Sequence, residues 1–322
     1  MLLIGSAAVL SAIAFALGVY AEFGRLWGEI RGFQWELLPL LVLLTCINYA
    51  FRYLRWEYLL SRVGGETYPR YANIKVFFSG GGLILTPGRI GELSRSIYAR
   101  ELFGIPMSRS SPIMFTERIF DSLVMIGLAG MGTILFARGY LYLIIGAAAT
   151  CILLILIFRN SLLWKLLPNL PIQIFRNRLA FALENAGSSF ELLTSPGVAF
   201  IQIVLGTLAW GVECMTFAVV LSGLGMPLDT DLILKACVIL PISTLLGNLS
   251  FLPAGLGVTE AGIVGLSQAL LPMGQGQAAA AALIARCLVI SGALIPGLVS
   301  LLLLRGDSSS TSRNPSVPVE PA

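Results

Sequence analysis

The chain has 322 residues, of which 57% are hydrophobic and 12% are charged, with a formal net charge of +4. Soluble domains carry about 25% charged residues, so the composition excludes an ordinary soluble enzyme and predicts a polytopic membrane protein. The absence of histidine excludes histidine metal sites, Ser-His-Asp triads and histidine proton relays. No lysine follows a glycine, which excludes a Walker A loop. The cysteines lie in apolar stretches without a C-x-x-C pair, and we expect neither a metal site nor a cofactor.

Six segments are apolar and long enough to cross a bilayer as helices, which takes about 20 residues each. In chain order they cover residues 2–21, 37–60, 112–136, 140–158, 198–224 and 278–304. Residues 176–193 have helical apolar spacing typical of an interfacial helix. We therefore expect an all-α membrane protein with one transmembrane domain over residues 1–305. A Ser- and Pro-rich, disordered cytoplasmic tail is expected over residues 306–322.

Two further apolar regions, residues 71–100 and 232–271, are interrupted by glycine and proline. The interruptions are G-G-G at 80–82 and T-P-G at 86–88 in the first region, and Pro241, G-N at 247–248 and P-A-G-L-G at 253–257 in the second. Such residues in series break helices, and irregular backbone at membrane depth survives only inside protein or beside a wet cavity. We predict two re-entrant hairpins in addition to the six full spans. A pair of ordinary spans with proline kinks remains an alternative.

The distribution of basic residues predicts the orientation. With six spans and two returning hairpins, most arginine-rich connections lie on one side of the membrane, together with the C-terminal tail. The positive-inside rule makes that side cytoplasmic and places both termini there. The hairpins then enter from opposite sides, as in inverted-repeat transporters, and the expected location is the cell (plasma or inner) membrane.

Charged residues inside the predicted spans are the first functional candidates, because each costs about 2.5–3.5 kcal/mol at mid-bilayer. They must therefore face one another or a wet cavity. These residues are Glu117, Arg118, Asp121, Glu213 and Arg286. Two interpretations stay open: ion pairs that only fix helix packing, and a polar path across the membrane.

Each predicted hairpin tip is a Pro/Gly loop followed by a glutamate at a helix start. Glu92 follows P-G-R-I-G, and Glu260 follows P-A-G-L-G-V-T. A glutamate there caps the helix and is favoured by its dipole. The same exposed N–H groups can bind a phosphate, which Arg89 and Arg95 would grip through two hydrogen bonds each.

Three more polar residues are candidates for contact with lipid. Arg52 and Arg55, three apart at the end of the second span, would gather anionic lipid headgroups at the cytoplasmic side, or would only anchor the span. Asn248 is a polar group at membrane depth, where helix–helix contact is the simpler explanation.

Four features in order resemble the lysylphosphatidylglycerol synthase transmembrane-region family: T-P-G-R-I-G-E-L-S-R (86–95), T-E-R-I-F-D (116–121), L-P-A-G-L-G-V-T-E (252–260) and a late intramembrane arginine. The resemblance covers about residues 1–305. It implies a flippase-like domain that moves aminoacylated phosphatidylglycerol between leaflets. The cavity-lining positions that it implies are Arg89, Glu92, Glu117, Arg118, Asp121, Glu260 and Arg286. Because a short tail stands where the synthase has its aminoacyl-transferase domain, we expect a stand-alone member that does not make the lipid.

The leading hypothesis is a lipid translocase for an anionic or aminoacylated phospholipid or a related polar lipid. In it Arg89, Arg118 and Arg286 bind phosphate, while Glu117, Asp121, Glu213 and Glu260 balance them. The alternatives are a secondary transporter of a small anionic solute and a non-transporting scaffold for lipid synthesis. We expect no enzyme activity, because no nucleophile–base constellation is visible. Membrane phospholipids are the expected partners, with a lipid-synthesising enzyme or a second copy of the chain as further candidates and no nucleic acid.

Overall fold

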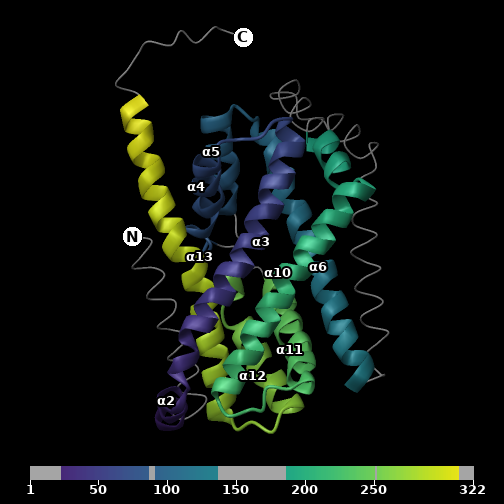
Figure 1. Ribbon diagram of the computed structural model, residues 1–322, viewed down its shortest axis with the longest axis vertical. Helices are drawn as coiled ribbons and strands as arrows, with labels where there is room; N and C mark the ends of the chain where they lie inside the picture. The colour runs from purple at the N-terminus through teal and green to yellow at the C-terminus, as the bar shows by residue number, and fades with distance from the viewer. Residues whose placement is uncertain (1–22, 87–90, 137–185, 251, 312–322) are drawn as a thin grey trace, which may run out of the picture.

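Four long helices form the frame of the molecule in the computed structural model, which describes residues 23–86, 91–136, 186–250 and 252–311. The long helices are α3 (Leu38–Gly64), α6 (Met107–Phe136), α10 (Pro196–Gly223) and α13 (Gln275–Thr311). They lie over four of the six predicted spans and run along the length of the bundle (Figure 1). All secondary structure in the described residues is helical, as the composition predicts. The spans predicted at 2–21 and 140–158, and most of the interfacial helix, lie outside the described residues.

Two helical hairpins pack between the long helices. They consist of α4 (Arg70–Gly81) with α5 (Ser94–Phe103), and of α11 (Thr230–Leu249) with α12 (Val258–Leu270). The first hairpin occupies the upper half of the bundle in Figure 1, and the second occupies the lower half. Each hairpin is formed by one of the two interrupted apolar regions of the sequence.

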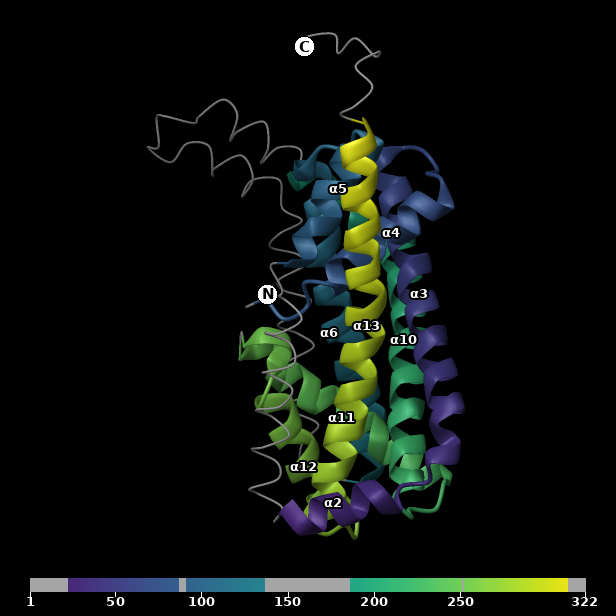
Figure 2. The ribbon, with the colours of Figure 1, turned by 90° about the vertical axis from the view of Figure 1, so that its left-hand side faces the viewer.

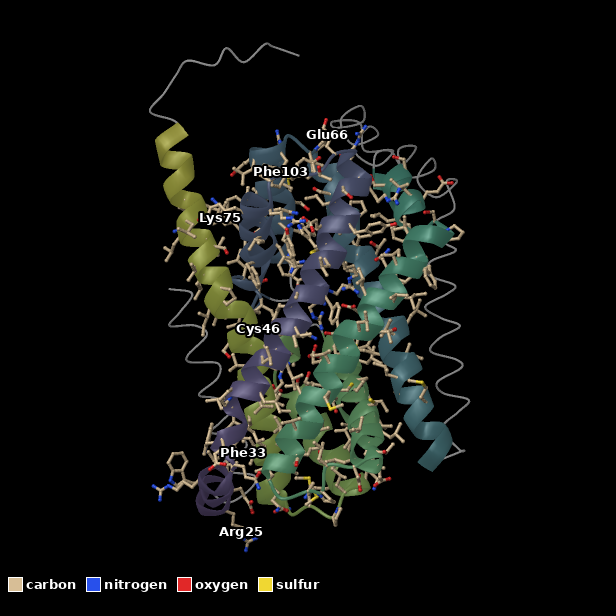
Figure 3. All side chains as sticks on the ribbon, viewed as in Figure 1. Arg25, Phe33, Cys46, Glu66, Lys75 and Phe103 are labelled. Atoms are coloured by element: carbon tan, nitrogen blue, oxygen red, sulfur yellow. The ribbon has the colours of Figure 1, made fainter. Side chains whose placement is uncertain are left out.

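The first hairpin is fastened at both its base and its tip. At the base, the Tyr68 ring stacks on that of Phe103 with centroids 4.5 Å apart. At the tip, the Gly91 N–H donates a hydrogen bond of 2.7 Å to Oγ1 of Thr86. The chain therefore enters and leaves this hairpin at the same end of the bundle, the end where Figure 3 labels Glu66 and Phe103.

The second hairpin corrects part of the prediction, because α11 continues through Pro241 and Gly247 and ends only at Leu249. The expected breaks at Pro241 and at 247–248 were wrong. Proline is tolerated inside membrane helices, where the helix can continue through it. Gly247 serves close packing instead, since a Cβ there would overlap the Thr259 side chain.

The glycines before the first tip likewise allow close approach of helices. A Cβ on Gly81 would lie 2.6 Å from the Ala293 carbonyl oxygen of α13, and a Cβ on Gly297 would overlap the backbone of Gly82. The G-G-G run thus ends α4 and also brings it into backbone contact with α13.

Two boundaries differ from the predictions. The short helix α2 (Phe23–Gly32) lies across the lower end of the bundle (Figure 2), between the predicted spans 2–21 and 37–60, where no helix was predicted. Its amphipathic pattern buries Leu26, and Phe33 follows it into the core. At the other end of the chain, α13 extends to Thr311, so the domain boundary expected at residue 305 lies inside a helix.

Two hydrophobic clusters fill the bundle at different heights. One gathers α10–α13 with the later part of α6 around Met125 and Phe217, and the other gathers α3, α4 and α5 around Trp56 and Phe77. Along α3 and α6 the charged residues lie between positions belonging to the two clusters. The apolar core is therefore divided by a polar layer.

Within the part of the chain that the structure describes, four stretches have the length and hydropathy of a membrane span: Trp35–Gly64, Pro196–Gly223, Thr230–Leu249 and Gln275–Arg305. Their outer faces carry exposed large apolar side chains, such as Leu43 and Phe200. Such a surface is unsuited to water. The chain is therefore a multi-pass membrane protein.

Candidate functional site

A cavity of about 90 Å³ lies in the polar layer, with room for several water molecules. Both hairpins reach it: Ile84 and Glu92 line it from the first tip, and Thr244 and Asn248 line it from the end of α11. The remaining wall comes from α3, α6, α10 and α13. Its charged lining residues are Arg52, Arg55, Arg95, Arg118, Arg286, Glu92, Glu117 and Glu213.

Asp121 of α6 lies directly behind this lining and is only 2% exposed. Its Oδ1 is 2.7 Å from Nη1 of Arg55. Its Oδ2 is 3.7 Å from Nη1 of Arg52 and 3.8 Å from Nη1 of Arg118. One buried carboxylate therefore holds three arginines and ties α3 to α6.

Arg52 extends the network from α3 to α10. Its Nη2 donates 2.7 Å to Oε2 of Glu213, and its Nε donates 2.9 Å to Oδ1 of Asn48. Asn48 in turn donates to the Ala209 carbonyl at 2.6 Å. The guanidinium also lies 5.0 Å from the ring centroid of Trp210, at cation–π distance.

The first hairpin joins the same network through two carboxylates. Glu117 lies 3.6 Å from Nε of Arg55 and 3.4 Å from Nη1 of Arg95. Glu92 accepts a hydrogen bond of 2.5 Å from Nη2 of Arg118. Among the described residues the network contains four arginines and four carboxylates, whose formal charges cancel: Arg52, Arg55, Arg95, Arg118, Glu92, Glu117, Asp121 and Glu213. Within the described residues no group of three or more His, Cys, Asp or Glu could hold a metal ion.

A separate pair pins the second hairpin tip to α13. Arg286 donates 2.6 Å from Nε to Glu260 and 2.6 Å from Nη2 to the Ala254 carbonyl. The other oxygen of Glu260 accepts from the Gly257 N–H at 2.6 Å and so caps α12. Ala254 has a φ of 50°, which costs a non-glycine residue about 1–2 kcal/mol. The capping and ion-pair interpretations of Glu260 therefore both hold.

The two tip glutamates have matching partners. Glu92 pairs with Arg118, and Glu260 pairs with Arg286; the two residues of each pair are 26 positions apart. In both cases the glutamate stands near the start of a hairpin's second helix, and the arginine lies in the long helix that follows. The pairs differ in exposure, since the Arg118 side chain is 31% exposed and that of Arg286 only 8%.

Three N–H donors of cavity-lining residues lack a hydrogen-bond acceptor among the described residues. They are Nε of Arg55, Nε of Arg95 and Nε1 of Trp210. Buried N–H groups seldom go without an acceptor. Several arginines around one cavity suit an anion rich in oxygen, such as a phosphate.

The structure brings nearly all the predicted site residues to this layer. Glu92, Arg95, Glu117, Arg118, Glu213, Asn248 and Arg286 line the cavity, and Asp121 and Glu260 pair with lining arginines. Arg89 lies outside the described residues.

Arg52 and Arg55 lie in a different place from the predicted lipid-gathering surface. Both line the cavity, and the Arg55 side chain is only 3% exposed. The physical reason is that α3 continues past them to Gly64 and buries Leu59 and Leu60 beyond the arginines. They are therefore members of the buried network.

Several lining residues were not among the predicted site residues, and Asn48, Tyr49 and Trp210 are three of them. Asn48, Arg52 and Arg55 follow the i, i+4, i+7 spacing of one helix face, a signal that would have placed both arginines beside a buried amide. No comparable signal marks Tyr49, whose hydroxyl donates 3.1 Å to the Val289 carbonyl of α13.

Known proteins resemble this chain along most of its length. It is 24% identical over 280 residues to the UPF0104 membrane protein of Methanothermobacter thermautotrophicus, covering 79% of each chain. It is 22% identical over 294 residues to glycosyltransferase AglD of Haloferax volcanii, covering 80% of this chain and 47% of AglD. No solved structure matches it. Residues 2–297 match the family described as the lysylphosphatidylglycerol synthase TM region, and the chain belongs to that family.

Proposed function

We propose that the protein is a lipid translocase, flippase- or scramblase-like, that moves an anionic or aminoacylated phospholipid or a related polar lipid between leaflets. The observation that carries this proposal is the charged cavity in the middle of an apolar bundle, where two helical hairpins meet. A polar headgroup needs such a surface to cross the hydrocarbon layer, because an unpaired charge there is costly.

In this proposal both hairpins are re-entrant. At 1.5 Å per residue, α4 and α5 are about 18 and 15 Å long, roughly half of a hydrocarbon core of about 30 Å. In the second hairpin α12 is also short, at about 20 Å. α11 is long enough to be a span, but its end at Asn248 faces the same cavity as the first tip. Together with six full spans, this topology places both termini on the cytoplasmic side of the cell membrane.

The arrangement of the two halves supports an inverted repeat. Helices α3–α6 and α10–α13 share one order, a helical hairpin between two long helices, and the two halves run in opposite directions through the bundle (Figure 1). α4 packs on α13, and α11 packs on α6. The equivalent Glu92–Arg118 and Glu260–Arg286 pairs add a chemical match. Inverted repeats meeting at the bilayer midplane are the architecture of many alternating-access transporters.

The charge balance of the network suggests how a headgroup would be accommodated. A headgroup phosphate would replace a carboxylate as the partner of an arginine. The carboxylate released from that arginine could then pair with a cationic aminoacyl group. Arg118 is the most exposed of the four network arginines, so its pair with Glu92 is the first to exchange. No covalent bond forms or breaks, and the proposed protein is not an enzyme.

Reconstitution tests this proposal. Phosphatidylcholine liposomes would contain the protein and a trace of phosphatidylglycerol with a dithionite-sensitive fluorophore on one acyl chain. External dithionite bleaches only the outer leaflet unless lipid crosses, so we expect nearly complete bleaching with protein and about half without. Bleaching at the protein-free rate would reject the translocase. Uptake of inorganic phosphate into the same vesicles without lipid crossing would favour the transporter of a small anion.

A further inference from the structure

An apolar groove of about 560 Å³ lies beside the charged cavity. It runs along the seam between α3, α4 and α13, and its lining residues Val42, Ile74 and Ile295 are 48%, 40% and 63% exposed. Cys46 and Ala50 also line it and are exposed. In a bundle surrounded by lipid, this face meets hydrocarbon.

The groove and the cavity share a wall. Thr45, Tyr49 and Phe78 line both. The rings of Tyr49 and Phe78 have centroids 6.0 Å apart, and the Tyr49 hydroxyl bonds to the Val289 carbonyl across the seam. The side chains of these three residues therefore form a shared wall between the charged interior and the apolar outer face.

The seam between α3 and the pair α4 and α13 is also loosely packed. α3 packs mainly against α10, and α4 packs mainly against α13, while α3 makes few contacts with either α4 or α13. At the closest approach, a Cβ on Gly292 of α13 would lie 2.8 Å from Cγ2 of Thr45 and 2.9 Å from Cε2 of Tyr49. A glycine at this point leaves room for the tyrosine ring between the two helices.

We infer that this groove holds a hydrocarbon chain of the translocated lipid while its headgroup lies in the charged cavity, and that Tyr49 and Phe78 form the lateral passage between them. The inference rests on the proposed function and adds the route of entry. Its occupant must be amphiphilic, because an arginine-lined cavity and an apolar groove adjoin at one wall. A soluble anion would leave the groove without a role, and a second copy of the chain would leave the passage without one.

Photo-crosslinking tests the occupant. Liposomes of phosphatidylcholine would contain phosphatidylglycerol with a diazirine at the end of one acyl chain, and labelled peptides would be mapped by mass spectrometry. We expect labelling of α3 and α13 groove positions to fall several-fold in the double variant Glu92→Gln/Arg118→Gln, which removes a headgroup anchor. Labelling around Phe200, exposed at 64% on α10, should not change and serves as the control. Equal groove labelling with and without the anchor would overturn the inference.

A matched pair of tryptophans tests the passage. Ala50→Trp adds bulk inside the groove, whereas Leu43→Trp adds it to the same helix outside the groove, at a side chain that is 56% exposed. We expect Ala50→Trp to slow lipid crossing several-fold and Leu43→Trp to leave it unchanged. If the wild type is active and both variants match it, the passage is wrong and the translocase stands. If the wild type moves no lipid, the translocase fails, and the crosslinking result alone decides whether the groove holds a chain.

Discussion

At the scale of single residues, Asp121 is the carboxylate of the network that contacts the most arginines among the described residues. It is buried, and three guanidinium groups lie within 4 Å of its carboxylate oxygens. Removing one partner of a buried ion pair leaves uncompensated charge in a medium that solvates it poorly. A substitution of Asp121 should therefore destabilise the protein by more than the loss of a single ion pair would.

Asp121→Asn should lower the free energy of unfolding by about 3–5 kcal/mol and slow lipid crossing, because Arg52 and Arg55 would then repel each other without their shared counter-charge. Thermal unfolding in detergent and the bleaching assay measure the two effects. The control is Asp231→Asn: Asp231 pairs with Lys235 at 2.7 Å, but its side chain is 50% exposed. Its loss should cost no more than about 1 kcal/mol, and equal destabilisation by both substitutions would contradict the assigned role of Asp121.

The sequence predicted that the carboxylates inside the spans would be buried, but it did not predict the burial of Arg52 and Arg55, which pair with them. Glu117 and Asp121 stood out because charge inside an apolar span is rare. Arg52 and Arg55 lie near the end of the apolar part of α3, where position along the sequence cannot distinguish an interfacial arginine from a buried one. Only the packing of α6 and α10 against α3 decides their role.

At the scale of helices and loops, the sequence located both broken regions but not the reason for each glycine or proline. Pro241 was expected to interrupt a helix, but α11 continues through it, as membrane helices often do at a proline. Gly81 and Gly82 were expected only to end a helix, and they also let α4 approach the α13 backbone. Such contacts join distant segments, so local propensity cannot reveal them.

Gly297→Ala should destabilise the protein by about 1–3 kcal/mol, since the new methyl group would overlap the rigid backbone of Gly81 and Gly82. Gly265→Ala in α12 is the control, because nothing lies within 4 Å of its Cβ position. Melting temperatures in one detergent compare the two variants. Equal melting temperatures would mean that the α4–α13 contact is looser than the structure indicates.

The proposed re-entrant topology makes a separate prediction about loop positions. Single cysteines at Glu66 and Glu101, on either side of the first hairpin, should react with an impermeant thiol reagent from the same side of the membrane. A cysteine at Asp229, before α11, should react from the opposite side. All three positions are exposed. Labelling of the first two from opposite sides would mean that the region crosses the membrane completely.

At the scale of the whole molecule, the two halves resemble each other more in structure than in sequence. Similar Pro/Gly tips gave a weak hint of a repeat, and the order and packing of the helices strengthen it. The sequence could not predict that four arginines and four carboxylates would join in one balanced layer, because their residues lie on α3, the first hairpin, α6 and α10. The apolar groove was equally hidden, since its lining residues look like ordinary lipid-facing positions.

The central claim is that these charges carry a headgroup across the membrane and do more than fasten helices. The double variant Glu92→Gln/Arg118→Gln separates the two roles, because replacing both partners of a buried pair by neutral groups is often nearly neutral for stability. The decisive measurement is its lipid crossing rate in the dithionite assay, with its melting temperature as the check on folding. We predict a melting temperature close to that of the wild type and crossing at the protein-free rate. Crossing at the wild-type rate by a stable double variant would contradict the claim.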